Sequence, residues 1–344
     1  MRKIDVFTHI FPAQYVERMQ QVAPGLKDAG KRVRGVPMLV DLDVRFRVMD
    51  TFEGYQQILS IATPPIEAYA SPADASDLAK RANDGMADLV RRYPDRFPGF
   101  IASLPMNHPE AALAELHRSI RTLGARGIQI FTNVCGKPIV SPEFLPLFEA
   151  MAGHDLPIFL HPYRGAGTAD YSTEDRSHYE IWWTFGWPYE TSVAMARIVF
   201  EGLFDRFPTL KIITHHMGAM APYFEGRLGP GWDQLGARTS DEDLSLVLKR
   251  LKRRPIDYFR MFYGDTALFG AYDATVCGLK FFGVDHVVFA SDAPFDPEKG
   301  PMYIRETIGI IDRLPITEGE RERIYWGNAA QLLKLPVDSA HQAA

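Results

Sequence analysis

The chain has 344 residues, 46% hydrophobic and 24% charged, which is the composition of a globular protein with a large core. A formal net charge of −5, without a long basic run, argues against a nucleic-acid partner. Two cysteines do not make a disulfide framework, no apolar segment approaches the roughly 18 residues of a membrane span, and no signal-peptide pattern follows Met1. We therefore expect a cytoplasmic protein that does not enter a membrane.

Eight short apolar runs alternate along the chain with segments of helical spacing. A long excursion, residues 11–40, follows the first run and contains a predicted helix at Gln14–Val22. A second excursion, residues 163–188, is polar at first and then rich in aromatic side chains, and a helix is expected from Glu190 to Phe204. The predicted strands are residues 4–9, 58–62, 100–104, 128–131, 158–161, 210–214, 261–265 and 287–292.

This alternation predicts an α/β fold, a single (β/α)₈ TIM barrel over residues 1–335 with a short tail at 336–344. The chain is longer than the ~250 residues typical of such a barrel, and we assign the surplus to the two excursions, on the catalytic face. A doubly wound open sheet is the rival architecture. It accounts less well for polar residues at the ends of strands one, five, six and eight, because a barrel brings all four ends to one mouth.

Residues that can bind a metal or move a proton end four of the predicted strands: His9, His161, His216 and Asp292. Barrel enzymes place their catalytic groups at the C-terminal ends of the strands, so these side chains are expected to meet. Imidazoles and a carboxylate are ligands of divalent transition metals, and three protein ligands with an open position describe a catalytic site. One such histidine is more often structural; the agreement of four strand ends predicts a metal site.

Several motifs resemble the metal-dependent amidohydrolase superfamily, in the amidohydrolase-2 branch that contains aminocarboxymuconate-semialdehyde decarboxylase and the dihydroxybenzoate-type decarboxylases. The opening Ile-Asp-Val-Phe-Thr-His-Ile-Phe-Pro at residues 4–12 resembles the branch's D-x-H-x-H-x-x-P pattern. The resemblance runs through most of the chain. Its other segments are Leu160-His161-Pro162, residues 204–211, His216-Met217-Gly218, residues 291–295 and Gly327-Asn328-Ala329.

The resemblance implies that His9, His161 and Asp292 bind one divalent metal ion, zinc or manganese, and that His216 is the acid–base group, with Asp292 as a second group that moves a proton. Strand alternation lets only one of His215 and His216 face the barrel interior, and the motif selects His216. His215 is then expected to pack or to support the site. Asp265, at the end of strand seven, is expected either to hold the site or to cap a helix.

The chain departs from the branch at Phe7, where the branch usually has a histidine or a glutamate. One interpretation is that the site has lost its metal and become an inactive small-acid-binding pocket. The other is a working site of two histidines, one aspartate and water, which is still a three-ligand set. The end of strand four, residues 131–133, offers no lysine to bridge two ions, which disfavours a two-metal site.

Three residues are candidates for substrate binding. Arg47 and Arg227 are possible carboxylate clamps, because a guanidinium fork matches two carboxylate oxygens; ordinary surface salt bridges are the alternative. Arg227 also matches a stretch that supplies an arginine to the neighbouring subunit's site in the semialdehyde decarboxylase, which implies a homodimer or higher homo-oligomer. Trp182, with Trp183 and Trp187, packs over an aromatic substrate or belongs to a core or dimer contact.

The resemblance implies an enzyme. The first hypothesis is a carbon–carbon lyase that decarboxylates an aromatic or conjugated carboxylic acid, a small-molecule carboxylate substrate. The second is a hydrolase of an ester, lactone, amide or C–C bond that uses metal-activated water, with His216 as base. The third is a catalytically inactive relative that binds a small acid. Carbon dioxide release separates the first hypothesis from the second, and the metal content of the purified protein separates the third from both.

Overall fold

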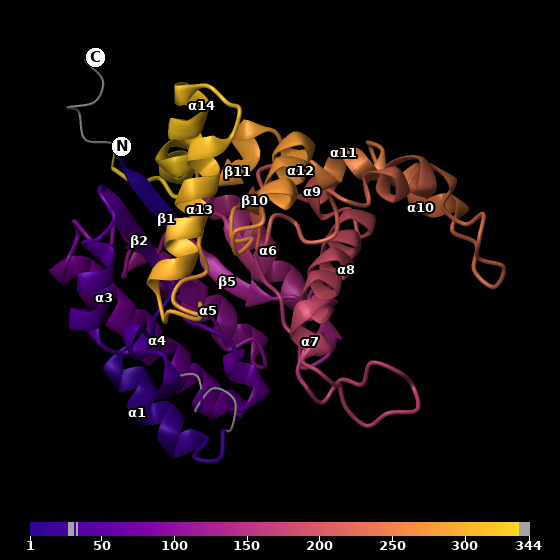
Figure 1. Cartoon of the computed structure of the whole chain (residues 1–344). Coiled ribbons are helices and arrows are strands. Elements are labelled where there is room, and N and C mark those ends of the chain that lie inside the picture. The colour runs from indigo at the N-terminus through magenta and orange to yellow at the C-terminus, as the bar shows by residue number, and fades with distance from the viewer. Residues whose placement is uncertain (27–30, 32–33, 337–344) are drawn as a thin grey trace.

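The computed structural model describes residues 1–26, 31 and 34–336, and its core is a ring of parallel strands surrounded by helices (Figure 1). Hydrogen bonding orders the strands as β1-β2-β3 and as β11-β10-β9-β8-β5-β4, and all these neighbours run parallel. The strands are β1 Lys3–His9, β2 Tyr55–Ser60, β3 Gly99–Phe100, β4 Ala102–Ser103, β5 Ile128–Phe131, β8 Ile158–His161, β9 Ile212–Thr214, β10 Tyr263–Asp265 and β11 Val287–Val288.

The two ladders are parts of one closed barrel. At one junction, β3 and β4 are halves of a single strand position, separated only by Ile101, whose N–H donates to the Leu59 carbonyl at 2.8 Å. At the other, the Val6 N–H donates to the Phe289 carbonyl at 3.0 Å, so the chain after β11 pairs with β1. The ring therefore has eight strand positions, and the predicted barrel is confirmed.

Helices occupy the outside of the barrel (Figure 1). Local sequence explains where some begin: the Ser71 hydroxyl accepts the Asp74 N–H at the start of α4, with Pro72 at the first helical position. The helices are α1 Ala13–Val22, α3 Leu42–Met49, α4 Pro72–Arg92, α5 Pro109–Arg121, α6 Leu145–His154, α7 Ile181–Thr184, α8 Gly186–Phe200, α9 Leu203–Arg206, α10 Ser245–Arg250, α11 Pro255–Phe259, α12 Tyr272–Phe282, α13 Pro301–Arg313, α14 Glu318–Glu322 and α15 Asn328–Leu332. Short 3₁₀ turns lie at Pro37–Leu39, Ile66–Ala68, Pro142–Phe144, Trp232–Gln234 and Val284–His286, and π-helical turns at Arg227–Gly231 and Arg323–Gly327.

Apolar side chains fill the inside of the barrel below the site. Phe7, Phe159, Ile213 and Val288 are fully buried and belong to one contact cluster. Because helices cover the outer face and this cluster covers the inner face, the strands are buried on both sides, which is why they appear in the sequence as continuous apolar runs.

The excursions from the barrel differ from the prediction in several details. Residues 11–40 hold α1 and a 3₁₀ turn, and residues 27–30 and 32–33 lie outside the described part. The helix expected at Glu190 begins at Gly186, as α8. Two elements were not predicted: a hairpin of β6 (Asn133–Val134) and β7 (Lys137–Pro138), and a third excursion between β9 and β10, whose α10 projects from the barrel (Figure 1). Of the predicted tail, 336–344, only Pro336 is described.

Among the described helices, none is both long enough and apolar enough to span a lipid bilayer.

Candidate active site

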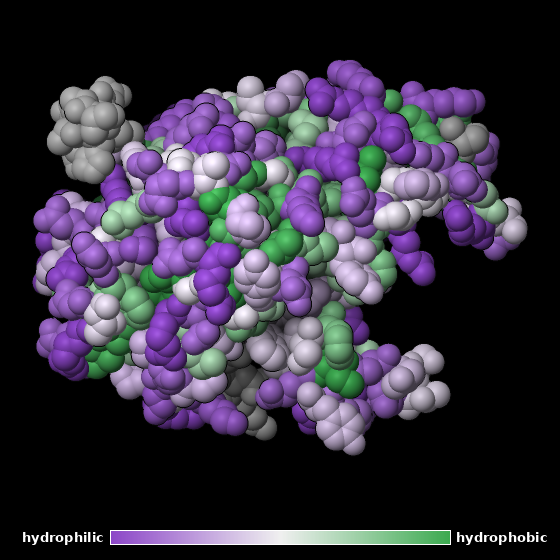
Figure 2. All heavy atoms as spheres, turned by 45° about the horizontal axis from the view of Figure 1, so that its top comes forward, coloured by the Kyte–Doolittle hydropathy of each residue, from purple (hydrophilic) through white to green (hydrophobic). Residues whose placement is uncertain are grey.

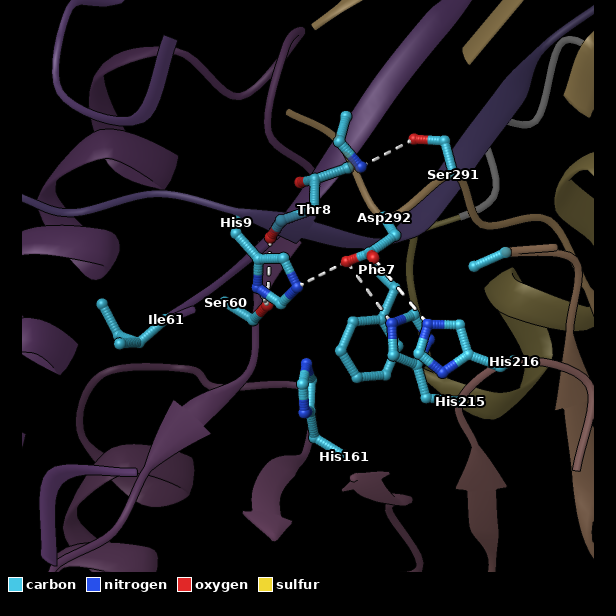
Figure 3. Close-up of polar contacts among 12 residues, drawn as sticks. Phe7, Thr8, His9, Ser60, Ile61, His161, His215, His216, Ser291 and Asp292 are labelled. Atoms are coloured by element: carbon cyan, nitrogen blue, oxygen red, sulfur yellow. Dashed lines mark hydrogen bonds and ion pairs between the residues drawn. The ribbon is translucent and has the colours of Figure 1, made fainter. Parts of the chain in front are cut away.

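The four predicted strand-end residues meet at the mouth of the barrel (Figure 3). His9 and His161 are the last residues of β1 and β8, His216 follows β9, and Asp292 follows β11. All four are buried. The Asp292 carboxylate is central: its Oδ1 lies 3.0 Å from His9 Nε2 and its Oδ2 lies 3.8 Å from His216 Nε2.

His215 also faces this site, and the expectation that only one of the two adjacent histidines could do so was wrong. His215 Nε2 lies 3.4 Å from Asp292 Oδ1, and the rings of His215 and His216 are 3.8 Å apart between centroids. Alternation does not apply because β9 ends at Thr214. His216 (φ 58°) and Met217 (φ 53°) then adopt left-handed backbone conformations, which turn both imidazoles toward Asp292.

Packing on the outer side of the barrel holds this turn. The Met217 side chain fits against two glycines: a Cβ on Gly278 would lie 2.0 Å from Met217 Cγ, and one on Gly264 would lie 2.9 Å from Met217 Sδ. Left-handed conformations of residues other than glycine cost free energy and persist only where their surroundings enforce them, often at functional sites. Asp265 contributes from inside, because its Oδ1 accepts the His216 N–H at 2.9 Å.

Hydrogen bonds fix which nitrogen of each imidazole faces the site. The Ser60 hydroxyl lies 3.1 Å from His9 Nδ1 and donates its own proton to the Thr8 carbonyl at 3.0 Å, so it accepts from His9 Nδ1–H. His161 Nδ1 lies 2.7 Å from the carbonyl of Pro162, which can only accept. Both histidines therefore turn an unprotonated Nε2 toward the centre of the site, the form in which imidazole binds metals.

The Nδ1 atom of His215 also has an acceptor on its outer side. It lies 2.5 Å from Asp265 Oδ2, and both side chains are fully buried. Asp265 thus supports the site, the first of its two expected roles, and it also accepts the Ala267 N–H at 3.1 Å. The Nε2 atoms of His215 and His216 are buried and make no hydrogen bond.

These donors fit a divalent metal ion. Within the described residues, two groups of three bring their ligand atoms within 4.8 Å of one another: His9, His161 and His215 in one, His215, His216 and Asp292 in the other. Buried imidazole nitrogens without partners, next to a carboxylate, are the donor set of a transition-metal site. Neither group is the predicted set of His9, His161 and Asp292, and His215 belongs to both.

The charges of the site also suit a cation. Burial raises the pKa of Asp292, but the contacts of its carboxylate with the imidazoles of His215, His216 and His9 lower it more, so its pKa is well below the usual range and the carboxylate is ionised. Burial lowers the pKa of His9 and His216 and, with the neighbouring histidines, holds that of His161 well below its usual value. Burial also lowers the pKa of His215, but Asp265 and Asp292 outweigh it and raise this pKa to about 9, so without a metal its Nε2 also carries a proton, which a bound cation would displace.

Asp5, which sequence reasoning placed only within a motif, positions Asp292. Its Oδ1 accepts the Ser291 N–H at 3.1 Å, and the Ser291 hydroxyl donates to its Oδ2. The Tyr55 hydroxyl donates to the same Oδ2 at 2.6 Å. Burial raises the pKa of Asp5 to about 7 against these hydrogen bonds. An acidic residue inside an apolar strand was the available signal for this role, because a buried carboxylate needs partners.

A small cavity lies above the cluster of histidines and Asp292, and aromatic rings form most of its wall. The Trp187 ring lies 5.4 Å from that of His161 and 6.5 Å from that of His216. Trp182, the predicted substrate-binding tryptophan, contacts Trp187 edge-on at 5.9 Å and is not among the cavity-lining residues. The lining residues are Thr63, His161, Trp183, Trp187, Phe269, Asp292, Phe295 and Tyr303.

Arg47 is not among the residues that line the cavity, which does not support its predicted role as a carboxylate clamp. It is exposed on α3, whereas Arg45 is fully buried and donates to Gln57 Oε1 at 2.6 Å and to the His9 carbonyl. Residues two apart on a helix lie about 200° apart, so only one of this pair faces the barrel. Arg45 stabilises the backbone of β1 at its final residue.

Arg227 is exposed and lies over the Phe224 ring at 5.8 Å. It lines a separate groove between α8 and the third excursion, not the mouth of its own barrel. In the space-filling view, this side of the molecule is hollowed between two projecting segments (Figure 2).

Comparison with known proteins agrees with the geometry. Residues 40–335 match the model of the family described as Amidohydrolase. The chain belongs to the amidohydrolase family. A gamma-resorcylate decarboxylase of Polaromonas sp. (strain JS666) is 33% identical over 307 residues, which cover 86% of this chain and 89% of the relative. A 2-amino-3-carboxymuconate-6-semialdehyde decarboxylase of Dictyostelium discoideum is 30% identical over 350 residues, 97% of this chain and 92% of the relative.

A solved structure from the same family holds a metal. The dihydroxybenzoic acid decarboxylase of Polaromonas sp. JS666, with bound manganese and the inhibitor 2-nitroresorcinol, superposes with a TM-score of 0.74 and 27% identity, over 97% of each chain. The predicted superfamily is therefore confirmed, and relatives from both predicted kinds of decarboxylase are found.

Proposed function

We propose that this amidohydrolase-family chain is a metal-dependent decarboxylase of an aromatic or conjugated carboxylic acid. The observation that carries the proposal is the convergence of buried imidazoles on the ionised Asp292 beneath a cavity walled by aromatic rings. Flat aromatic walls suit a planar conjugated ring, and the cluster at the cavity floor suits its carboxylate. The cavity has a volume of only about 20 Å³, so its walls must move apart to admit the ring. The names of the two relatives support the same reaction class.

The metal would be held by His9, His161 and Asp292, and it supplies Lewis-acid chemistry that withdraws electron density from the substrate. The protein's residues do the remaining work. Trp187 and Phe295 flank the cavity and orient the ring, and the same walls exclude bulk water. Exclusion of water favours loss of carbon dioxide over addition of water to the substrate.

Decarboxylation breaks the bond between the ring carbon and the carboxyl carbon, leaves the electron pair on the ring carbon, and requires a proton there as carbon dioxide departs. We assign the delivery of this proton to His216. Its Nε2 is buried, unpaired and 3.8 Å from Asp292 Oδ2, and burial and the charge of His215 lower its pKa, which makes the protonated imidazole a stronger proton donor. Asp292 is the second group within reach of the same carbon.

The test is a product assay with a panel of hydroxybenzoic acids, in which carbon dioxide and the decarboxylated arene are both measured. His216→Asn should retain the metal and lose rate on the order of 10²-fold or more. Products that have gained water, with no carbon dioxide, would replace the proposal with the hydrolase hypothesis. Wild-type activity in His216→Asn would refute the role of this residue.

A single manganese or zinc ion is the form of the cofactor that we propose. The donor set contains both imidazole and carboxylate groups, which bind either ion, and the manganese in the related decarboxylase supports the first. Metal analysis of the purified protein, before and after loading, gives both the identity and the number of ions per chain. Two tightly held ions per chain would contradict this assignment.

We further propose that the chain acts as a homodimer in which Arg227 approaches the partner's site. Its separation from the mouth of its own barrel supports this role, as does the apolar groove beside it, lined by Tyr189, Val193, Phe224 and Leu228. Light scattering during chromatography measures the mass of the assembly. Mixing an Arg227→Ala chain with an inactive His216→Asn chain should restore part of the activity if the arginine acts across the dimer, because one of the two sites would then be complete.

A further inference from the structure

Phe7 and His215 form a stacked pair at the floor of the site. Their ring centroids lie 3.9 Å apart with an angle of 14° between the planes, and both side chains are fully buried (Figure 3). Phe7 stands at the strand-one position where the amidohydrolase branch usually has a metal ligand. β1 therefore lacks an imidazole at this position, and the end of β9 supplies an additional one, whose ring stacks directly on Phe7.

His215 meets the geometric requirements of a ligand. Its Nε2 lies within 4.8 Å of the ligand atoms of His9 and His161, and it is buried with no hydrogen-bond partner. A buried polar atom without a partner costs free energy, so such an atom within a cluster of ligand atoms indicates a missing binding partner. Phe7 offers no such atom: its ring fills the space among the imidazoles, 5.6 Å from the His9 ring and 5.7 Å from the His161 ring.

The surroundings of His215 complete the pattern found at the two predicted histidine ligands. Each of the three donates its Nδ1 proton outward, His9 to a hydroxyl, His161 to a carbonyl and His215 to the Asp265 carboxylate. A carboxylate on the far nitrogen fixes the ring orientation of a ligating histidine and increases its basicity. His216 differs, because its left-handed backbone conformation sets its ring beside Asp292 rather than in the group with His9 and His161.

We infer that His215 is a metal ligand of this chain and replaces the strand-one ligand lost at Phe7, so that three histidines and Asp292 hold the ion. The number of protein ligands is then the same as with a strand-one ligand at position 7, but one of them comes from the end of β9 instead of from β1. His215 is then neither a packing residue nor a support of His216. The inference rests on the metal site of the proposed function but not on its reaction.

The first experiment counts the histidine ligands directly. In the cobalt(II)-loaded protein, labelled with ¹⁵N in its histidines, each imidazole that binds through Nε2 shows a strongly shifted, exchangeable Nδ1–H resonance. The wild-type protein should show three such resonances, and His215→Phe should show two. His216→Asn is the matched control, which should keep all three. Three resonances in His215→Phe, or two in the wild-type protein, would overturn the inference.

A chelator competition gives the second measurement. His215→Phe keeps a ring stacked on Phe7 but loses the ligand nitrogen, and its metal affinity should fall by at least about 10²-fold, whereas the affinity of His216→Asn should change less than tenfold. In the exchanged pair Phe7→His with His215→Phe, an imidazole returns to strand one, and the affinity should rise above that of His215→Phe alone. Affinity unchanged in a folded His215→Phe protein, verified by circular dichroism, would contradict the assignment.

The outcomes separate this inference from the proposed function. If the wild-type protein binds no metal, both the proposed function and the role of His215 are rejected. A wild-type protein that binds metal through two histidines but releases carbon dioxide keeps the function and rejects the role of His215. Three histidine ligands without decarboxylation keep the role of His215 and reject the reaction.

Discussion

Replacing Asp265 by asparagine should change which nitrogen of His215 carries the proton. Asparagine preserves the size of the side chain, and its carbonyl oxygen can still accept the N–H groups of His216 and Ala267 at 2.9 and 3.1 Å. Its amide group then faces His215 Nδ1 with a hydrogen where Asp265 has an acceptor at 2.5 Å. The favoured tautomer of His215 becomes the one protonated on Nε2, which cannot bind a metal.

Two quantities follow from these contacts. Loss of a supporting carboxylate costs about 10–100-fold in metal affinity at known sites, and we expect Asp265→Asn to fall in this range. In the metal-free protein, the change removes the negative charge of a fully buried pair. Breaking such a pair costs about 3–5 kcal/mol in general, and we expect about 3 kcal/mol here because the hydrogen bonds from His216 and Ala267 are retained. Chelator competition measures the affinity, and urea unfolding of the metal-free protein measures the free energy.

Asp312→Asn is the matched control. Asp312 is exposed and accepts a hydrogen bond from the Tyr325 hydroxyl at 2.8 Å, on the outside of the barrel, so Asp312→Asn makes the same chemical change without touching the site. It should leave metal affinity unchanged. If Asp265→Asn binds metal as tightly as the wild-type protein and is equally stable, Asp265 does not fix the tautomer of His215, and the account given for this pair is wrong.

Three further predictions concern stability. Gly278→Ala should lower the free energy of unfolding by about 1–3 kcal/mol and reduce activity, because the new methyl group overlaps Met217 and disturbs the His215–His216 turn. Thermal unfolding and turnover measure the two effects. Gly309→Ala, where the new methyl group meets no other atom, is the control. Glu67 is buried, its Oε1 has no partner, and burial raises its pKa to about 7, so the folded state keeps a proton that the unfolded state releases above about pH 4.5. The free energy of unfolding should therefore fall between pH 4.5 and 7 by up to about 3 kcal/mol more in the wild-type protein than in Glu67→Gln, and an equally steep fall in Glu67→Gln would rule this out. Removal of the metal by a chelator should lower the melting temperature by about 4 °C relative to protein with free metal at 100 times its dissociation constant, and readdition should restore it.

The barrel was predictable because its signal is local. Each strand is buried on both faces and therefore appears as a short apolar run, and the ends of four such runs carry the residues that meet at the mouth. The boundaries moved by a few residues, as at β9, which begins at Ile212 rather than Leu210. The excursion between β9 and β10 was missed because its short helices show little apolar periodicity.

The site was only partly predictable, because side-chain direction beyond a strand end depends on the surrounding packing. Alternation excluded His215, yet the left-handed turn at His216, held by Met217 against two glycines 47 and 61 residues away from it, brings His215 inside. The same limit applies to α3, where the sequence gives no means of telling that Arg45 rather than Arg47 faces the barrel. The homo-oligomer and the cytoplasmic location remain predictions.

The position of Asp292 beside β1 has a consequence for biosynthesis. His9 and Asp292 are separated by 283 residues in sequence but by only 3.0 Å between their polar atoms, where the last strand position pairs with the first. A chain still emerging from the ribosome thus has no complete ion-binding site until nearly all of it has been synthesised. The complete donor set forms only after ring closure, and a cation bound there would join the first strand to the last.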